Sequence, residues 1–105
     1  MYRSAANSQY YYRLRGTGNG ETILSGEGYT TKQSCLTGIA SVKLNSEYDS
    51  RYERKDSINN YTFNLKSGNG EIIGRSENYT SRAGRENGIN AVKRDAASAP
   101  IEDLS

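Results

Sequence analysis

The chain has 105 residues, a formal net charge of +2 and 33% hydrophobic residues, which suits one small folded domain. It contains no histidine and one cysteine, so histidine-based acid–base catalysis, an ordinary zinc site and an intrachain disulfide are excluded. No long apolar run indicates a signal peptide or a membrane helix, and a lone cysteine fits a reducing compartment. We therefore expect a cytoplasmic protein with no membrane partner, no cofactor and no metal.

The first predicted elements are strands. A short strand is expected at residues 2–3, and Tyr12 and Leu14 then alternate with polar positions, which is the period of a half-buried strand. A Gly-Asn-Gly turn at residues 18–20 follows, and these residue types tolerate the positive φ of a tight hairpin. Residues 21–26 are expected to return as the second strand of the hairpin.

A helix is predicted next, beginning near Thr31, because a hydroxyl side chain can accept a hydrogen bond from a free N–H of the first turn. Cys35, Ile39 and Val42 follow at i, i+4 and i+7, which places them on one helical face. Gly38 lies in the middle of this helix, where glycine costs about 1 kcal/mol relative to alanine. Its presence predicts a close approach of the backbone to a strand or to the other helix.

The second half of the chain repeats the first. Residues 18–21 recur as residues 68–71, fifty positions later, and residues 38–39 recur as residues 88–89. Upstream of the hairpin turn the offset becomes 51, because the first copy has one more turn residue. Matches spread over a whole unit indicate an internal duplication of a folded module rather than a chance motif.

The second helix is predicted to begin near Ser81 and to keep the apolar face of the first helix. Ile89 is the counterpart of Ile39, and we expect the two to be equivalent core anchors. Residues 85–86, Arg-Glu, replace the Cys-Leu of residues 35–36. The first turns of the second helix are therefore expected to be more solvated.

A third kind of strand completes the prediction. Residues 51–54 precede the second hairpin, and residues 100–104 follow the second helix as 51–54 follow the first, with a proline at the start where a missing N–H is harmless. The predicted fold class is α+β, a tandem duplication of a β-β-β-α unit with a closing C-terminal strand and two helices packed on an antiparallel sheet. The two repeats, about residues 1–50 and 51–105, are expected to form a single domain.

Three motifs of the second copy recur together in a specific pattern. They are residues 65–66 with 68–74, residues 76–79, and residues 88–93, and each has a partner in the first copy. In these motifs the chain resembles the YegP-like family of small bacterial tandem-repeat proteins of unknown function. The resemblance implies the duplicated α+β fold and implies no assigned activity, cofactor or catalytic residue. The chain departs from the family pattern in its short first strand.

Two positively charged features are candidates for binding phosphate or nucleic acid. One is a strand face that carries cations beside tyrosine rings, as in many single-strand binders. The other is the pair of helix N-termini, where a hydroxyl cap and a cation meet unpaired N–H groups. The residues concerned are Arg13, Arg15, Thr31, Lys32, Ser81 and Arg82. The alternative interpretation of the same residues is a solvated sheet face and ordinary structural caps.

Glu27 and Glu77 each precede a repeated tyrosine, Tyr29 or Tyr79, by two residues. Such a carboxylate pair could serve acid–base chemistry or hold a divalent metal. The alternative is a structural role in building the same loop twice, and a lone buried Cys35 is likewise expected to be structural.

The leading functional hypothesis is a non-catalytic cytoplasmic binding or interaction module, and not an enzyme, because no nucleophile–base constellation can be assembled. The open sheet edges leave self-association, for instance as a homodimer, as one option. Weak nucleic-acid or phosphate binding through the basic strand face and the helix N-termini is the alternative.

Overall fold

The computed structural model describes residues 1–16, 20–101 and 103–104. Its strands and helices follow the duplicated order of the sequence. In chain order they are β1 (Tyr2–Arg3), β2 (Tyr10–Tyr11), β3 (Arg13–Arg15), β4 (Thr22–Ser25), α1 (Lys32–Asn45), a short 3₁₀ helix η1 (Asp49–Arg51), β5 (Tyr52–Ser57), β6 (Asn60–Lys66), β7 (Ile72–Arg75) and α2 (Arg82–Asp95). The α+β duplication predicted from the sequence is confirmed.

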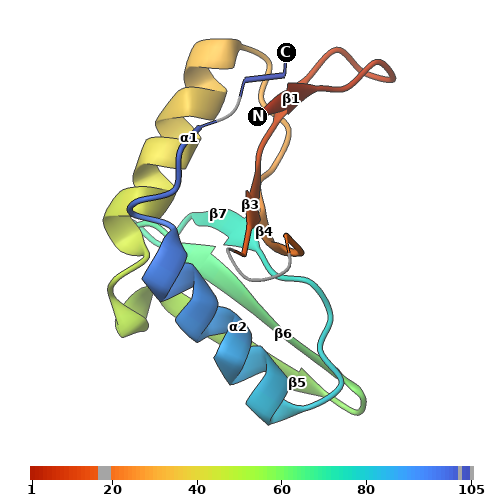
Figure 1. Cartoon of the computed structure of the whole chain (residues 1–105), viewed down its shortest axis with the longest axis vertical. Helices are drawn as coiled ribbons and strands as arrows, with labels where there is room; N and C mark the ends of the chain where they lie inside the picture. Colours follow the sequence, from red (N-terminus) through yellow and green to blue (C-terminus); the bar gives the residue numbers. More distant parts are fainter. Residues whose placement is uncertain (17–19, 102, 105) are drawn as a thin grey trace.

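One antiparallel sheet runs through both repeats. Its strand order is β3-β4-β7-β6-β5, and the pairing of Ser25 in β4 with Arg75 in β7 joins the two halves at its centre. Both helices pack on this sheet (Figure 1), α1 against β6 and β7 and α2 against β4 and β6. Each helix therefore covers a strand that belongs to the other repeat.

The hydrophobic core is a single cluster drawn from both repeats. Leu24, Phe63 and Ile89 are among its most buried side chains. The two repeats are not identical at the junction of β4 and β7, because Gly74 stands where the first repeat has Leu24. A Cβ at Gly74 would lie only 2.7 Å from a Leu24 methyl carbon, so the glycine leaves the space that the leucine fills. No helix of the described residues is long and apolar enough to cross a membrane.

The glycines inside the two helices are explained by tyrosine rings. A Cβ on Gly38 would lie 2.7 Å from Cζ of Tyr29, and a Cβ on Gly88 would lie 2.6 Å from Cζ of Tyr79. A close approach to each helix was predicted, but the approaching group is a side chain from the segment just before that helix. The expectation of a strand or the other helix at this place was wrong, because the tyrosine occupies the space above the missing side chain.

The hairpin turn of the second repeat is described in full, and that of the first repeat only in part. Gly70 has a φ of +87°, and its turn is closed by the N–H of Ser67, which donates to the carbonyl of Glu71 at 2.9 Å. This is the conformation that the Gly-Asn-Gly pattern predicted. In the first repeat Gly20 also has a positive φ, of +74°, while residues 18–19 of that turn lie outside the described residues.

The predicted closing strand at residues 100–104 is not a strand in its described part. The segment instead runs beside α1 and returns to the start of the chain (Figure 1). Lys32 in α1 forms an ion pair with Asp103 at 2.5 Å, and the N–H of Leu104 donates to the carbonyl of Met1 at 2.9 Å. These contacts hold the segment along the helix, away from the hydrogen-bonding edge of the sheet.

Two expectations about the helices were also wrong. Ile89 is 1% exposed, whereas Ile39 is only half-buried, so the two positions are not equivalent. Arg85 is buried rather than solvated, because β5 provides Asp56 as an ion-pair partner and Glu86 a second one at 3.0 Å.

Candidate functional site

Both predicted helix caps are present. The side chain of Thr31 accepts a hydrogen bond from the N–H of Ser34 at 3.0 Å, and that of Ser81 accepts one from the N–H of Gly84 at 3.0 Å. Each hydroxyl therefore already satisfies one of the N–H groups that a bound anion would use. The caps serve the helices, which is the structural role considered for them from the sequence.

The cations beside these caps are ion-paired. Lys32 contacts Asp103, and Arg82 contacts Asp56 at 3.0 Å. A phosphate at either helix N-terminus would compete with a carboxylate that is already there. Anion binding at these two places stays a prediction, and a phosphate titration of backbone amides, compared with Lys32→Ala and Arg82→Ala, tests it.

The glutamates of the repeated loops are not brought into a metal site. Glu27 forms an ion pair with Arg75 at 2.6 Å, which ties the loop before α1 to the central strand β7. Among the described residues no group of three or more metal-ligating side chains gathers. Cys35 is fully buried, and this burial raises the pKa of its thiol, so the thiol is not primed as a nucleophile.

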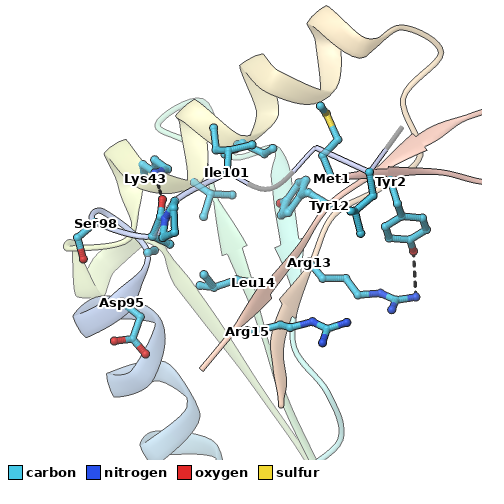
Figure 2. Close-up of a pocket in the computed structure, with 16 residues that line it drawn as sticks. Met1, Tyr2, Tyr12, Arg13, Leu14, Arg15, Lys43, Asp95, Ser98 and Ile101 are labelled. Atoms are coloured by element: carbon cyan, nitrogen blue, oxygen red, sulfur yellow. Dashed lines mark hydrogen bonds between the residues drawn. The ribbon is translucent and has the colours of Figure 1, made fainter. Parts of the chain in front are cut away.

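The arginines of β3 lie at the rim of a cavity that the sequence did not reveal. The cavity has a volume of about 630 Å³ and lies between β3, α1 and the segment after α2 (Figure 2). Its inner walls include Tyr12, Leu14, Ile39, Val42, Lys43 and Ala96. Arg13 and Arg15 also border it, whereas the capping residues and cations of the helix N-termini do not.

Arg13 combines a cation with an aromatic ring at this rim. Its guanidinium carbon lies 4.6 Å from the centre of the Tyr2 ring, and a guanidinium nitrogen donates to the Tyr2 hydroxyl at 3.2 Å. The Tyr2 ring in turn stacks on Tyr11 at 5.6 Å between centroids. A cation and a tyrosine ring therefore meet at this rim, although the ring that Arg13 contacts belongs to β1 and not to its own strand face, and binding of nucleic acid here stays a prediction.

The second repeat shows how the equivalent place is filled. There the side chain of Tyr52, the first residue of β5, is 6% exposed. Its hydroxyl donates to the carbonyl of Ser46 at 2.7 Å, and its ring meets Phe63 edge-on at 5.7 Å. The ammonium of Lys93 lies 5.5 Å from the ring centre. Burial of the ring raises the pKa of the Tyr52 phenol.

Each residue around Tyr52 has a counterpart in the cavity of the first repeat. At the repeat offsets of 50 and 51, Ser46 corresponds to Ala96 and Phe63 to Tyr12, while Lys93 corresponds to Lys43. Of these counterparts, Tyr12 and Lys43 line the cavity as Figure 2 shows, and Ala96 also lines it. The cavity therefore lies at the place in the first repeat that the Tyr52 ring occupies in the second.

The strands beside the cavity are paired differently in the two repeats. In the second repeat β5 pairs with β6 from Tyr52 opposite Leu65 to Ser57 opposite Asn60. In the first repeat β1 pairs only with β2, and within the described residues β3 is the outermost strand of its sheet. The Tyr12 carbonyl accepts a hydrogen bond from the N–H of Gly26, the residue after β4, so alternation turns the backbone groups of Arg13 to the side of β3 away from β4.

The fold and this site together define the class of protein. It is an internally duplicated α+β protein whose sheet, within the described residues, has β3 at one edge and β5 at the other, with a cavity beside β3. "Domain of unknown function (DUF1508)" matches the chain twice, over residues 5–53 and 56–103. The chain belongs to this family, as the resemblance to YegP-like proteins predicted.

Relatives and solved structures agree with this assignment. A UPF0339 protein of Acinetobacter baylyi is 44% identical over 96% of this chain and 91% of its own. YegP of Escherichia coli K12 is 47% identical over 60% of this chain, and the match spans 57% of that relative, a little over half its length. The solution structure of a UPF0339 protein of Shewanella oneidensis superposes with a TM-score of 0.89 at 41% identity, over 98% of this chain and 86% of that one. The solution structure of E. coli YegP gives a TM-score of 0.87 at 44% identity, over 97% and 87% of the two chains.

Proposed function

We propose that this protein is a non-catalytic interaction module that binds an extended segment of another polypeptide along β3, the outermost strand of its sheet within the described residues. The observation that carries the proposal is that an apolar cavity lies directly beside β3. An edge strand offers backbone hydrogen bonds, and an adjacent pocket selects a side chain, which is how strand addition combines affinity with specificity.

A non-catalytic role agrees with the chemistry of the described side chains. The one thiol is buried, and the repeated Glu27 is engaged with an arginine. Nothing in the family to which the chain belongs indicates an enzymatic activity. We also propose a cytoplasmic location, which the lone reduced Cys35 supports.

Nucleic-acid binding is a second candidate, favoured by one observation. Arg13 stands over the Tyr2 ring at the exposed end of β3, and a cation beside an aromatic ring suits a single-stranded nucleotide. A gel shift with single-stranded oligonucleotides at two salt concentrations tests it. Retention that weakens steeply with salt and is lost in Arg13→Ala would support this candidate.

Strand addition is tested by following backbone amides of the full chain during titration with a mixture of short extended peptides. The amides of Arg13 and Leu14 should shift first, together with that of Ala96 across the cavity. The amides of residues 54–56, on the outer edge strand β5, are the internal control and should move less. Shifts spread evenly over both edges, or absent from β3, would contradict the proposal.

A further inference from the structure

We propose that the groove between the end of α1 and the β6–β7 turn binds the free C-terminal carboxylate of a partner polypeptide that ends in a large apolar residue. The groove has a volume of about 510 Å³ and lies beside η1 and the turn at residues 67–69. It shares no lining residue with the cavity beside β3. Binding here is therefore a second function of the chain, independent of strand addition at β3.

One arginine is fixed in this groove by a buried amide. Nε of Arg51 donates to the side-chain oxygen of Asn45 at 3.0 Å, and Asn45 is 6% exposed. The amide nitrogen of Asn45 donates to the carbonyl of Ser41 at 2.8 Å, which keeps the amide oxygen turned towards the arginine. A guanidinium held through Nε presents its two outer nitrogens to a ligand with two acceptor oxygens.

The charge of Arg51 has no internal counter-ion among the residues that the structure describes. The carboxylate of Asp49, two residues earlier in the chain, contacts Arg54 at 3.0 Å and Lys93 at 2.7 Å. Arg51 itself is half-buried, so water screens its charge less than that of a fully exposed arginine. A negatively charged ligand is therefore attracted to this groove.

The turn beside Arg51 supplies backbone donors. A Cβ on Gly68 would lie 3.5 Å from Nη2 of Arg51, so the guanidinium rests against the turn. The N–H of Gly70 closes the turn by donating to the carbonyl of Ser67 at 3.0 Å. Within the described part of the chain, the N–H groups of Gly68 and Asn69 donate to no protein acceptor. Successive N–H groups of this kind in a turn form a concavity that binds anions.

Apolar surface borders the same groove. Leu44 is 69% exposed and Tyr48 is 48% exposed, and both line it. The guanidinium carbon of Arg51 lies 5.7 Å from the centre of the Tyr48 ring, so the cationic and apolar parts of the groove adjoin. A ligand that covers these two side chains removes apolar surface from water while its anion meets the guanidinium.

The charge around the groove favours a carboxylate over a phosphate. A hydrogen bond with Glu47 raises the pKa of the Tyr48 phenol, which shows that a negative charge lies beside the ring. Because that charge offsets part of the attraction from Arg51, a ligand with a single negative charge is better matched than a phosphate with a charge of about −2.

A chain terminus combines the anion and the apolar group in one residue. Its carboxylate and the side chain of its last residue leave the same Cα, so both fit a groove of this size. Backbone nests are known to capture the carboxylates of chain ends. An internal aspartate or glutamate would bring further backbone polar groups into the groove, and each of these would need a partner of its own.

The combination belongs to the second repeat. At the repeat offset of 50, the positions of Tyr48 and Arg51 correspond to Ser98 and Ile101. The position of Leu44 corresponds to that of an arginine, Arg94, which is already paired with a carboxylate at 2.9 Å. The described part of the first repeat therefore offers neither the ring nor the unmatched guanidinium at this place.

The test follows the backbone amides of the full chain and the Arg51 Nε–H signal during titration with acetyl-Ser-Gly-Leu that carries a free carboxylate. The amides of Gly68 and Asn69 and the Arg51 signal should shift. The same peptide ending in a carboxamide should bind about tenfold more weakly, because it makes no charge-assisted hydrogen bond. Replacing the last leucine by glycine should weaken binding severalfold, because less apolar surface is then covered.

Variants of the protein assign the effect to the two parts of the groove. Arg51→Gln should abolish the difference between the free acid and the carboxamide. Lys55→Gln, which removes an exposed cation of β5 outside the groove, is the matched control and should retain that difference. Leu44→Ala should abolish the preference for leucine over glycine. Leu44 is exposed, so this variant keeps its fold and tests the site even where Arg51→Gln does not fold.

Equal binding of the free acid and the carboxamide would overturn the proposal. Equal binding of acetyl-Ser-Asp-Leu carboxamide would also overturn it and would identify an internal acidic side chain as the ligand. Shifts at Gly68 and Asn69 with inorganic phosphate but not with the peptide would overturn it in favour of a phosphate site. No shift at these residues with millimolar peptide would overturn it and leave strand addition intact, because the amides of Arg13 and Leu14 report on β3 separately.

Discussion

Gly88→Ala tests whether a tyrosine ring dictates the glycine inside each helix. In an exposed helix this change gains about 1 kcal/mol, because alanine is the better helix former. Here the added Cβ would lie 2.6 Å from Cζ and 3.2 Å from Cε2 of Tyr79. Tyr79 is anchored through its backbone, which exchanges hydrogen bonds with Tyr61 at 2.8 and 2.9 Å, so the ring cannot withdraw freely.

The size of the effect follows from these two opposing terms. Overpacking a core costs about 1–3 kcal/mol, and the anchored ring places this site at the upper end. After subtracting the helix gain, Gly88→Ala should lower the free energy of unfolding by about 2 kcal/mol. Urea denaturation followed by far-ultraviolet circular dichroism measures this change. Asn90→Ala, at an exposed position of the same helix, is the matched control and should be neutral or slightly stabilising.

The ring itself is tested by a double mutant. Tyr79→Leu removes the ring atoms above Gly88 while retaining an apolar side chain. In that background Gly88→Ala should become neutral or stabilising, which is a change of sign. Gly38→Ala with Tyr29→Leu repeats the test in the first repeat, where the Cβ-to-Cζ distance would be 2.7 Å. A stabilising Gly88→Ala in the otherwise unchanged protein would refute the reasoning.

Three further predictions concern stability. We propose that both repeats form one cooperative domain, so neither half produced alone should give a cooperative thermal transition, and a sharp melt of either half would refute this. Ile89→Ala should cost about 2–5 kcal/mol in chemical denaturation because the side chain is buried, and half-buried Ile39→Ala should cost clearly less; equal losses would contradict the packing. Hydrogen bonds from Arg54 and then Lys93 lower the pKa of Asp49 from 3.8 to about 2. The Asp49 carboxylate therefore stabilises the folded chain above pH 3.8, and this contribution is lost as the pH falls towards 2. A titration of the Asp49 carboxyl ¹³C shift measures the pKa. A midpoint near 3.8 would show that the contacts with Arg54 and Lys93 do not persist.

Local signals in the sequence were sufficient for most of the fold. Thr31 and Ser81 cap the helices because capping depends on residues within one turn. The repeat predicted the duplicated strands because both copies carry the same turn residues. In each case the determining contacts lie within a few residues of one another, so a single sequence contains them.

What the sequence did not predict depends on contacts between distant segments. Arg85 is buried because Asp56 of β5 reaches it, and no local pattern reports that pairing. Residues 100–104 matched the position of β5 in the repeat, yet ion pairing of Asp103 with Lys32 directs them along α1. Ile39 is half-buried because it faces the cavity rather than a filled core.

The candidate site was only partly accessible from the sequence. Arg13 and Arg15 were identified as a charged strand face, and the structure adds the cavity behind them. The signal that could have located the cavity is the contrast between the short strand at residues 2–3 and the longer strand at residues 51–54. Its meaning requires knowing which residues surround Tyr52, and that is a property of the folded chain.

The central claim is that β3 accepts an added strand along its outer side, and hydrogen exchange of the Arg13 amide tests it most directly. Asn64, its counterpart in β6, lies opposite Glu53 of β5, so its amide should exchange slowly in the free protein. The Arg13 amide should exchange rapidly in the free protein and become protected when the mixture of short extended peptides is added, while that of Asn64 stays unchanged. An Arg13 amide that is already protected in the free protein, or that gains no protection at saturating peptide, would contradict the account.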